Sequence, residues 1–335
     1  MEKEDKSKRD ASIVESSGRG LARLFPVMAC ATLLTALIAV VMGGIVRVTG
    51  SGLGCPDWPL CQGGIIPPWE LAPWLEYLHR LSAAVSGVFT LLMVITGFKQ
   101  YGMRSRPMYI VFLAAGLLVT QAILGAYTVL SELRPGIALI HTAVATSLVG
   151  VLTIIAAGAL RPSWLQEGVW HSSQIGRFRW LIVALGIAIF ILIISGAYVT
   201  RTEGAPLACT EVPHCGTSVG DMVDIQWIHM THRGIALVVG FMMLVVLVRS
   251  RKIGHAGITM MTGLMTALLT IQIGLGIGNV VLRLPNEIRA LHLATGMLFF
   301  AAVMFLIGIM WNSALAGKEV SVMTKRGSNA PSGAL

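Results

Sequence analysis

Charged residues are scarce in this chain. They make up 12% of its 335 residues, whereas 55% of the residues are hydrophobic and the mean hydropathy is +0.76. A water-soluble domain of this size would need far more charge to cover its surface. The shortage of charge therefore excludes an ordinary soluble domain and predicts a protein that crosses a membrane several times.

The chain also lacks a phosphate-binding loop, because no Lys followed by Ser or Thr comes after its Gly-rich segment GSGLG at 50–54. The net charge of +9 does not indicate a nucleic-acid partner. Most lysines and arginines fall in segments expected on one side of the membrane. The opposite side holds only Arg47, Arg134, Arg201 and Arg283. This bias predicts that both termini lie in the cytoplasm. We expect a multi-pass protein of the inner (plasma) membrane.

Eight apolar stretches are long enough to cross the hydrocarbon core, which takes about 20 residues. They are 24–48, 74–98, 108–131, 136–160, 178–201, 226–249, 256–281 and 286–312. The first is too long for a signal-peptide core, so we expect a true helix there. The sequence predicts an all-α polytopic membrane protein with polar cytoplasmic tails at 1–23 and 313–335.

The chain repeats itself after four helices. Residues 47–61 (RVTGSGLGCPDWPLC) match 201–215 (RTEGAPLACTEVPHC), LEYLHRLSA from 75 matches IHMTHRGIA from 228, and the segment from 121 to His141 matches that from 272 to His292. The register barely drifts between these matches. An even number of helices keeps both copies the same way up. We therefore expect two parallel-repeat four-helix bundles, at 24–160 and 178–312.

Four histidines lie at matching depths in the predicted helices: His79 and His141 in the first half, His232 and His292 in the second. Their positions correspond to a depth of roughly 10 Å below the outer surface at 1.5 Å per residue. An ionisable ring inside a bilayer marks a functional site by default, and imidazole is a common axial ligand of haem iron. One such histidine is often only a packing residue, but four equivalent ones favour two haem sites. The loop histidines, expected to be solvated, are His171, His214 and His255.

The two halves differ three residues before the first histidine of each pair. Glu76 precedes His79, whereas His229 precedes His232. An i, i+3 spacing places both side chains on neighbouring parts of one helix face. The carboxylate is interpreted either as a proton donor or acceptor beside a reaction centre or as a solvated boundary residue. His229 is a spare ligand, a hydrogen-bond partner or an interfacial residue.

Arg80 and Arg233 directly follow His79 and His232 in the two copies. A charged side chain within a span needs an anionic partner. Haem propionates are one candidate, because guanidinium groups bind carboxylates well. A salt bridge to an outer-loop carboxylate is the other.

Two cysteine pairs lie in the expected outer loops: Cys55 with Cys61, and Cys209 with Cys215. The outer side of the membrane is oxidising enough for disulfides. Two short structural disulfides are the first interpretation, and redox-active or metal-binding thiols are the alternative.

The motifs GGIVRVTGSGLGCPDWPLC and EYLHR, and the loop that precedes each second histidine, resemble those of the haem A synthase family over residues 24–312. That resemblance implies oxidation of a ring methyl of haem O to the formyl group of haem A, by successive hydroxylations with oxygen from water. It implies that His79 and His141 flank the substrate haem and that His232 and His292 ligate haem b. It also implies that Glu76 is catalytic and that the cysteine pairs form disulfides.

Membrane lipid and haem O are the expected partners, with haem O synthase (a protohaem farnesyltransferase), oxidase assembly factors and a second copy of the chain as further candidates. The alternative function is a di-haem b-type electron-transfer protein that only relays electrons. A transporter built from parallel repeats would instead need a polar cavity at mid-membrane. The polar residues of this chain cluster near the outer face.

Overall fold

The fold is entirely helical in the computed structural model, which describes residues 24–160, 173–216 and 218–328. The long helices are α2 (Phe25–Val48), α3 (Leu71–Tyr101), α4 (Arg106–Leu130), α5 (Pro135–Leu160), α6 (Ser173–Val199), α7 (Asp224–Ile253), α8 (Ala256–Val281) and α9 (Asn286–Ser328). Short 3-10 helices, η2 (Ala205–Leu207) and η3 (Val219–Asp221), lie between α6 and α7. Across these ranges 8 helices are long and apolar enough to span a membrane, and no β-strand occurs. The predicted all-α polytopic membrane fold is confirmed.

The helix bounds differ from the predicted spans mainly at the ends. Helix α3 extends beyond 74–98 on both sides, and α9 continues to Ser328 through most of the segment predicted as a polar tail, 313–335. Residues such as Lys318 and Glu319 have good helix propensity, so a helix can continue past the apolar span that hydropathy detects. The tail predicted at 1–23 lies outside the described residues.

Local signals explain several helix ends. A proline occupies the first turn of α2 and of α4, where its missing N–H costs nothing. Gly254 ends α7 with a φ of 73°, a left-handed conformation that glycine adopts without steric cost. His255 then caps α8, because its Nδ1 accepts the N–H of Ile258 at 3.3 Å. Its expected solvation is therefore wrong: the side chain is buried, since it serves as the helix cap.

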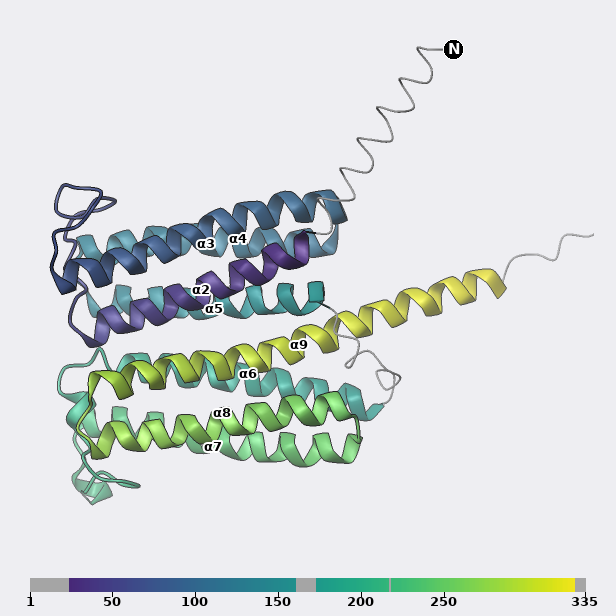
Figure 1. Ribbon diagram of the computed structural model, residues 1–335. Coiled ribbons are helices and arrows are strands. Elements are labelled where there is room, and N and C mark those ends of the chain that lie inside the picture. Colours follow the sequence, from purple (N-terminus) through teal and green to yellow (C-terminus); the bar gives the residue numbers. More distant parts are fainter. Residues whose placement is uncertain (1–23, 161–172, 217, 329–335) are drawn as a thin grey trace, which may run out of the picture.

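The helices form two sets of four, one above the other in Figure 1. In the first set, contacts run around a closed ring from α2 through α3, α4 and α5 back to α2. The second set repeats this order with α6, α7, α8 and α9. Helices α3 and α5 therefore stand at opposite corners of one ring, and α7 and α9 at opposite corners of the other. The interpretation of the two sets as parallel repeats remains a prediction.

The two sets pack together through α2, α5, α6 and α9. Gly308 of α9 marks a close approach, because a Cβ there would lie 2.8 Å from Cβ of Ala157 and 3.1 Å from Cα of Ile154 on α5. Large apolar side chains on the outward faces, such as Leu237 and Phe241, are exposed. Exposed apolar faces around a buried interface suit a protein surrounded by lipid.

Candidate functional site

His79 lies eight residues after Leu71, the first residue of α3, near the end of the molecule that carries both cysteine pairs. This end, at the left in Figure 1, is here called the disulfide end. The His79 Nδ1 lies 2.9 Å from the carbonyl oxygen of Ala39 on α2. A carbonyl only accepts, so Nδ1 carries the proton and donates it. This tautomer leaves the lone pair of Nε2 free for a metal ligand bond.

Gly43 of α2 lets the His79 ring approach closely. A Cβ at this glycine would lie 2.9 Å from Cε1 of His79, a distance that real Cβ atoms do not tolerate. The glycine one turn beyond Ala39 therefore forms one wall of the imidazole site.

His232 has the same arrangement in the second set of helices. Its Nδ1 lies 2.8 Å from Oγ of Ser195, and that hydroxyl donates its own hydrogen to the carbonyl of Leu192. The hydroxyl therefore accepts from Nδ1–H, which again leaves the Nε2 lone pair free. A Cβ at Gly196 would lie 2.9 Å from Cε1 of His232, the same distance as for Gly43 and His79.

His141 and His292 are held by glutamine side chains. Nε2 of His141 lies 3.1 Å from Nε2 of Gln121 on α4, and Nε2 of His292 lies 3.2 Å from Nε2 of Gln272 on α8. In both rings Nδ1 is buried without a hydrogen-bond partner among the described residues. Each of the four histidines therefore has one nitrogen held by the protein and one nitrogen left over.

The four rings form two pairs. His79 and His141 are close enough to interact electrostatically, and so are His232 and His292. The two histidines of each pair come from helices at opposite corners of one four-helix set. Each imidazole has one nitrogen without a hydrogen-bond partner among the residues that the structure describes. In the described part of the chain, no group of three His, Cys, Asp or Glu side chains could hold a bare metal ion. A haem needs only two axial ligands from the protein, so each pair fits a haem better than a zinc-type site.

Glu76 is buried, with 3% of its surface exposed. Its carboxylate accepts the backbone N–H of Cys55 at 2.9 Å and an N–H of Arg80 at 2.6 Å. The solvated alternative for Glu76 is therefore wrong. Among the described residues, the carboxylate that pairs with Arg80 is Glu76, four positions earlier on the same helix, and not one from an outer loop.

Arg80 also binds the loop that follows α2. It donates to the carbonyl oxygens of Cys55, Asp57 and Leu60. Arg233 makes equivalent contacts with the carbonyl oxygens of Cys209, Glu211, Pro213 and His214. Both arginines thus hold a loop of the disulfide end in place. Their contact with haem propionates stays a prediction.

His229 takes the place of Glu76 in the second set. It is buried, its Nδ1 has no hydrogen-bond partner among the described residues, and it interacts electrostatically with His232. Glu76 and His229 are thus both buried. The first site has a carboxylate near its first histidine, and the second site has an imidazole at the equivalent position.

The two cysteine pairs form disulfides, Cys55–Cys61 and Cys209–Cys215. The first loop is also tied by Asp57, whose carboxylate accepts the backbone N–H groups of Gln62 at 2.6 Å and Gly63 at 2.8 Å. The N–H of Gly63 holds the pKa of Asp57 below its ordinary value. A disulfide thus closes each loop, and the Asp57 carboxylate ties the first loop further.

Sequence reasoning missed the residues that position the histidines: Gly43, Gly196, Gln121, Gln272 and Ser195. A signal for the glutamines was present, because both occupy the first position of the repeated segment that ends at His141 or His292. Their contacts with the rings depend on how neighbouring helices pack, and the sequence does not show this packing.

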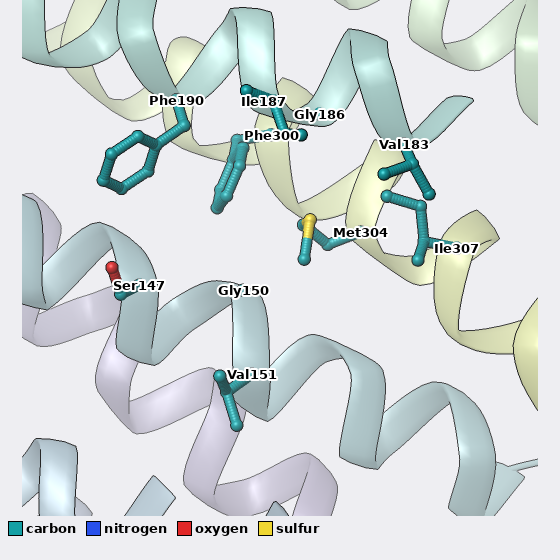
Figure 2. A pocket seen from close by; sticks show the side chains of 10 residues that line it. All are labelled: Ser147, Gly150, Val151, Val183, Gly186, Ile187, Phe190, Phe300, Met304 and Ile307. Atoms are coloured by element: carbon teal, nitrogen blue, oxygen red, sulfur yellow. The ribbon is translucent and has the colours of Figure 1, made fainter. Parts of the chain in front are cut away.

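An apolar cavity of about 300 Å³ lies between the two sets of helices, inward from the histidines (Figure 2). Its walls come from α5, α6 and α9: Ser147, Gly150, Val151, Val183, Gly186, Ile187, Phe190, Phe300, Met304 and Ile307. Ser147 supplies the one side-chain hydroxyl in this lining. Such a cavity suits an apolar group rather than a charged one.

Comparisons with known proteins give one consistent result. A model of the cytochrome oxidase assembly protein family matches residues 26–72 and 70–304. The chain is 30% identical over 210 residues to the Heme A synthase of Bacillus licheniformis, covering 62% of this chain and 68% of the relative. It is 26% identical to that of Bacillus mycoides, covering 91% and 99%, and 25% identical to that of Shewanella oneidensis, covering 86% and 97%.

Proposed function

Because the chain belongs to the cytochrome oxidase assembly protein family, we propose that it is a haem A synthase, a membrane oxidoreductase that converts haem O to haem A. The reaction oxidises a ring methyl group to a formyl group, by successive hydroxylations with oxygen from water. The electrons released pass to an external electron acceptor, and the protons pass to water. The observation that carries the proposal is the pair of matched two-histidine sites. Each site joins two histidines from opposite helices, and in each site one imidazole has a buried nitrogen without a hydrogen-bond partner among the described residues.

In this proposal His79 and His141 hold the substrate haem, and His232 and His292 hold haem b. Oxidising an unactivated methyl group is chemistry that a bound redox cofactor supplies, since amino-acid side chains do not. The chain's own residues orient and protect the site. Ala39 and Ser195 fix the tautomer of one histidine in each pair. The disulfide loops are bound by Arg80 and Arg233, the residues that directly follow these two histidines.

Glu76 is proposed as the proton-handling residue of the first site. It lies one turn outward from His79, and the second site has His229 instead of a carboxylate. Its ion pair with Arg80 and its bond to the N–H of Cys55 hold the carboxylate in one position. A positioned carboxylate of this kind can accept a proton as the methyl group is oxidised.

The substrate would reach the site through lipid, because haem O carries a farnesyl-derived tail. The apolar cavity between the two sets of helices suits such a tail (Figure 2). We place the protein in the inner (plasma) membrane with both termini in the cytoplasm. Haem O synthase and oxidase assembly factors are its candidate partners. The di-haem electron-transfer alternative is not favoured, because the curated relatives named here are synthases.

The decisive experiment is expression in cells that make haem O but no haem A, followed by chromatography of the extracted haems. We expect haem A or its alcohol intermediate in cells with the wild-type chain. Haem b alone in the purified protein, with no haem A in the cells, would favour the electron relay. Replacement of His232 or His292 by Ala should remove the low-spin haem b spectrum, and an unchanged spectrum in both variants would contradict the haem b assignment.

A further inference from the structure

Three arginines from distant parts of the chain meet at the disulfide end, where the two sets of helices join. They are Arg47 at the end of α2, Arg201 just after α6 and Arg289 in the first turn of α9. Arg47 is close enough to the other two for the charges to repel one another. A group of like charges at a partly buried position is costly unless an anion neutralises it.

The hydrogen bonds of this arginine cluster reach only neutral groups. Arg47 donates to the hydroxyl of Thr200, Arg201 donates to the hydroxyl of Thr142 at 2.7 Å, and Arg289 donates to the carbonyl of Val48 at 3.2 Å.

Within the described ranges no carboxylate forms an ion pair with any of the three arginines, in contrast to Arg80, which has Glu76. Nε of Arg201 is buried and has no partner there. Burial lowers the pKa of Arg201 to about 10, which still leaves it protonated at neutral pH. The cluster therefore has spare donors, positive charge and no counter-ion.

The cluster lies beside both histidine sites. Arg289 precedes His292 by three residues on one helix face, and Arg47 follows Gly43, the glycine that contacts His79, by one turn. Arg201 interacts electrostatically with His141 and bonds the neighbouring Thr142. The propionates are the charged groups of a haem. With the rest of the ring among apolar helices, they would point toward the polar disulfide end.

We propose that Arg47, Arg201 and Arg289 form a binding site for haem propionate carboxylates at the junction of the two halves. This inference rests on the proposed haem sites. The cluster joins residues of both sets of helices, so a bound carboxylate would also hold the halves together at this end. An anionic lipid phosphate has similar chemistry. The position of the cluster between the interface helices and next to the histidines favours the propionate.

The test compares haem b with its dimethyl ester, in which both propionates are uncharged. The full-length protein is purified from haem-depleted cells and titrated with each compound, and the Soret absorbance gives the two affinities. We expect wild type to bind haem b about tenfold or more tightly than the ester, since hydrogen bonds to charged groups are the strong ones. Arg201→Gln and Arg289→Gln should bring this ratio close to one, and Arg201→Lys should restore part of it.

The matched controls are Arg134→Gln and Arg283→Gln, which change exposed arginines of the same end and should keep the wild-type ratio. An equal ratio in wild type and in both Gln variants would overturn the inference while leaving the haem sites intact. Failure of wild type to bind either compound would instead overturn the proposed function. If the Gln variants lose affinity for spin-labelled phosphatidylglycerol with the haem ratio unchanged, the ligand is a lipid phosphate and the inference is wrong.

Discussion

At the scale of single residues, the glycines that face the histidines allow the sharpest test of the haem sites. Gly196→Ala would place a Cβ 2.9 Å from Cε1 of His232 and displace the ring. Alanine favours a helix over glycine by about 1 kcal/mol, so a loss cannot come from helix propensity. We expect overpacking to weaken haem b retention about tenfold, measured from the reduced spectrum of the purified protein.

The control for this variant is Gly263→Ala on α8, where a Cβ would meet nothing within 4 Å. It should keep the wild-type spectrum. Gly43→Ala should leave the haem b spectrum intact and lower haem A yield, because its clash is with His79. Full haem b retention in Gly196→Ala would show that the ring contact has no role in binding.

Glu76 is a second test at this scale. Glu76→Gln keeps the size of the side chain and can still accept the N–H of Cys55, but it removes the charge that pairs with Arg80. We expect haem b to remain and haem A yield to fall by about 10²–10⁴-fold, the usual worth of acid–base assistance. Haem O or the alcohol should accumulate.

Glu70→Gln is the matched control, because that carboxylate also lies at the disulfide end of the molecule and is exposed. Mass spectrometry of the unreduced Glu76→Gln protein should still find the Cys55–Cys61 link, which separates a catalytic loss from a displaced loop. A haem A yield within a few-fold of wild type would reduce Glu76 to a residue that only holds the loop.

At the scale of secondary-structure elements, the packing of α9 on α5 depends on Gly308. A Cβ there would lie 2.8 Å from Cβ of Ala157 and would press on the backbone of α5 at Ile154. Gly308→Ala should therefore lower the free energy of unfolding by about 1–3 kcal/mol, despite the better helix propensity of alanine. Thermal unfolding in detergent measures this, with Gly263→Ala again as the control. A Tm equal to or above that of wild type would mean that α5 and α9 can move apart at Gly308 without loss of stability.

At the scale of the whole molecule, the charge bias and the 8 spans together predict the topology. Both disulfide loops lie at one end of the molecule (Figure 1). We expect reporter fusions at residues 60 and 210 to be active only outside the cytoplasm, and fusions after residue 335 to be active only inside. A cytoplasmic signal at 60 or 210 would refute this orientation.

The candidate site was only partly predictable. The four histidines and the cysteine pairs stood out in the sequence because each occurs at corresponding positions of the two copies. The ion pair of Glu76 and Arg80 has an i, i+4 spacing that a helix implies. The sequence alone nevertheless does not favour this ion pair over the other candidate partners of Arg80, because it does not show that the carboxylate is buried. Burial depends on the loop that covers Glu76, and this loop closes through its own disulfide.

The sequence by itself determined which segments can cross the membrane. The length of an apolar segment and the distribution of charged residues are local properties, and they govern insertion into a bilayer. It also predicts that four imidazoles share one depth, since depth follows from position along a helix. Only the tertiary structure decided what surrounds them. Arg289 reaches the carbonyl of Val48 across 241 residues, and Gly43 meets His79 from another helix. Such contacts depend on side-chain packing between helices, and no periodicity within one helix encodes its partner.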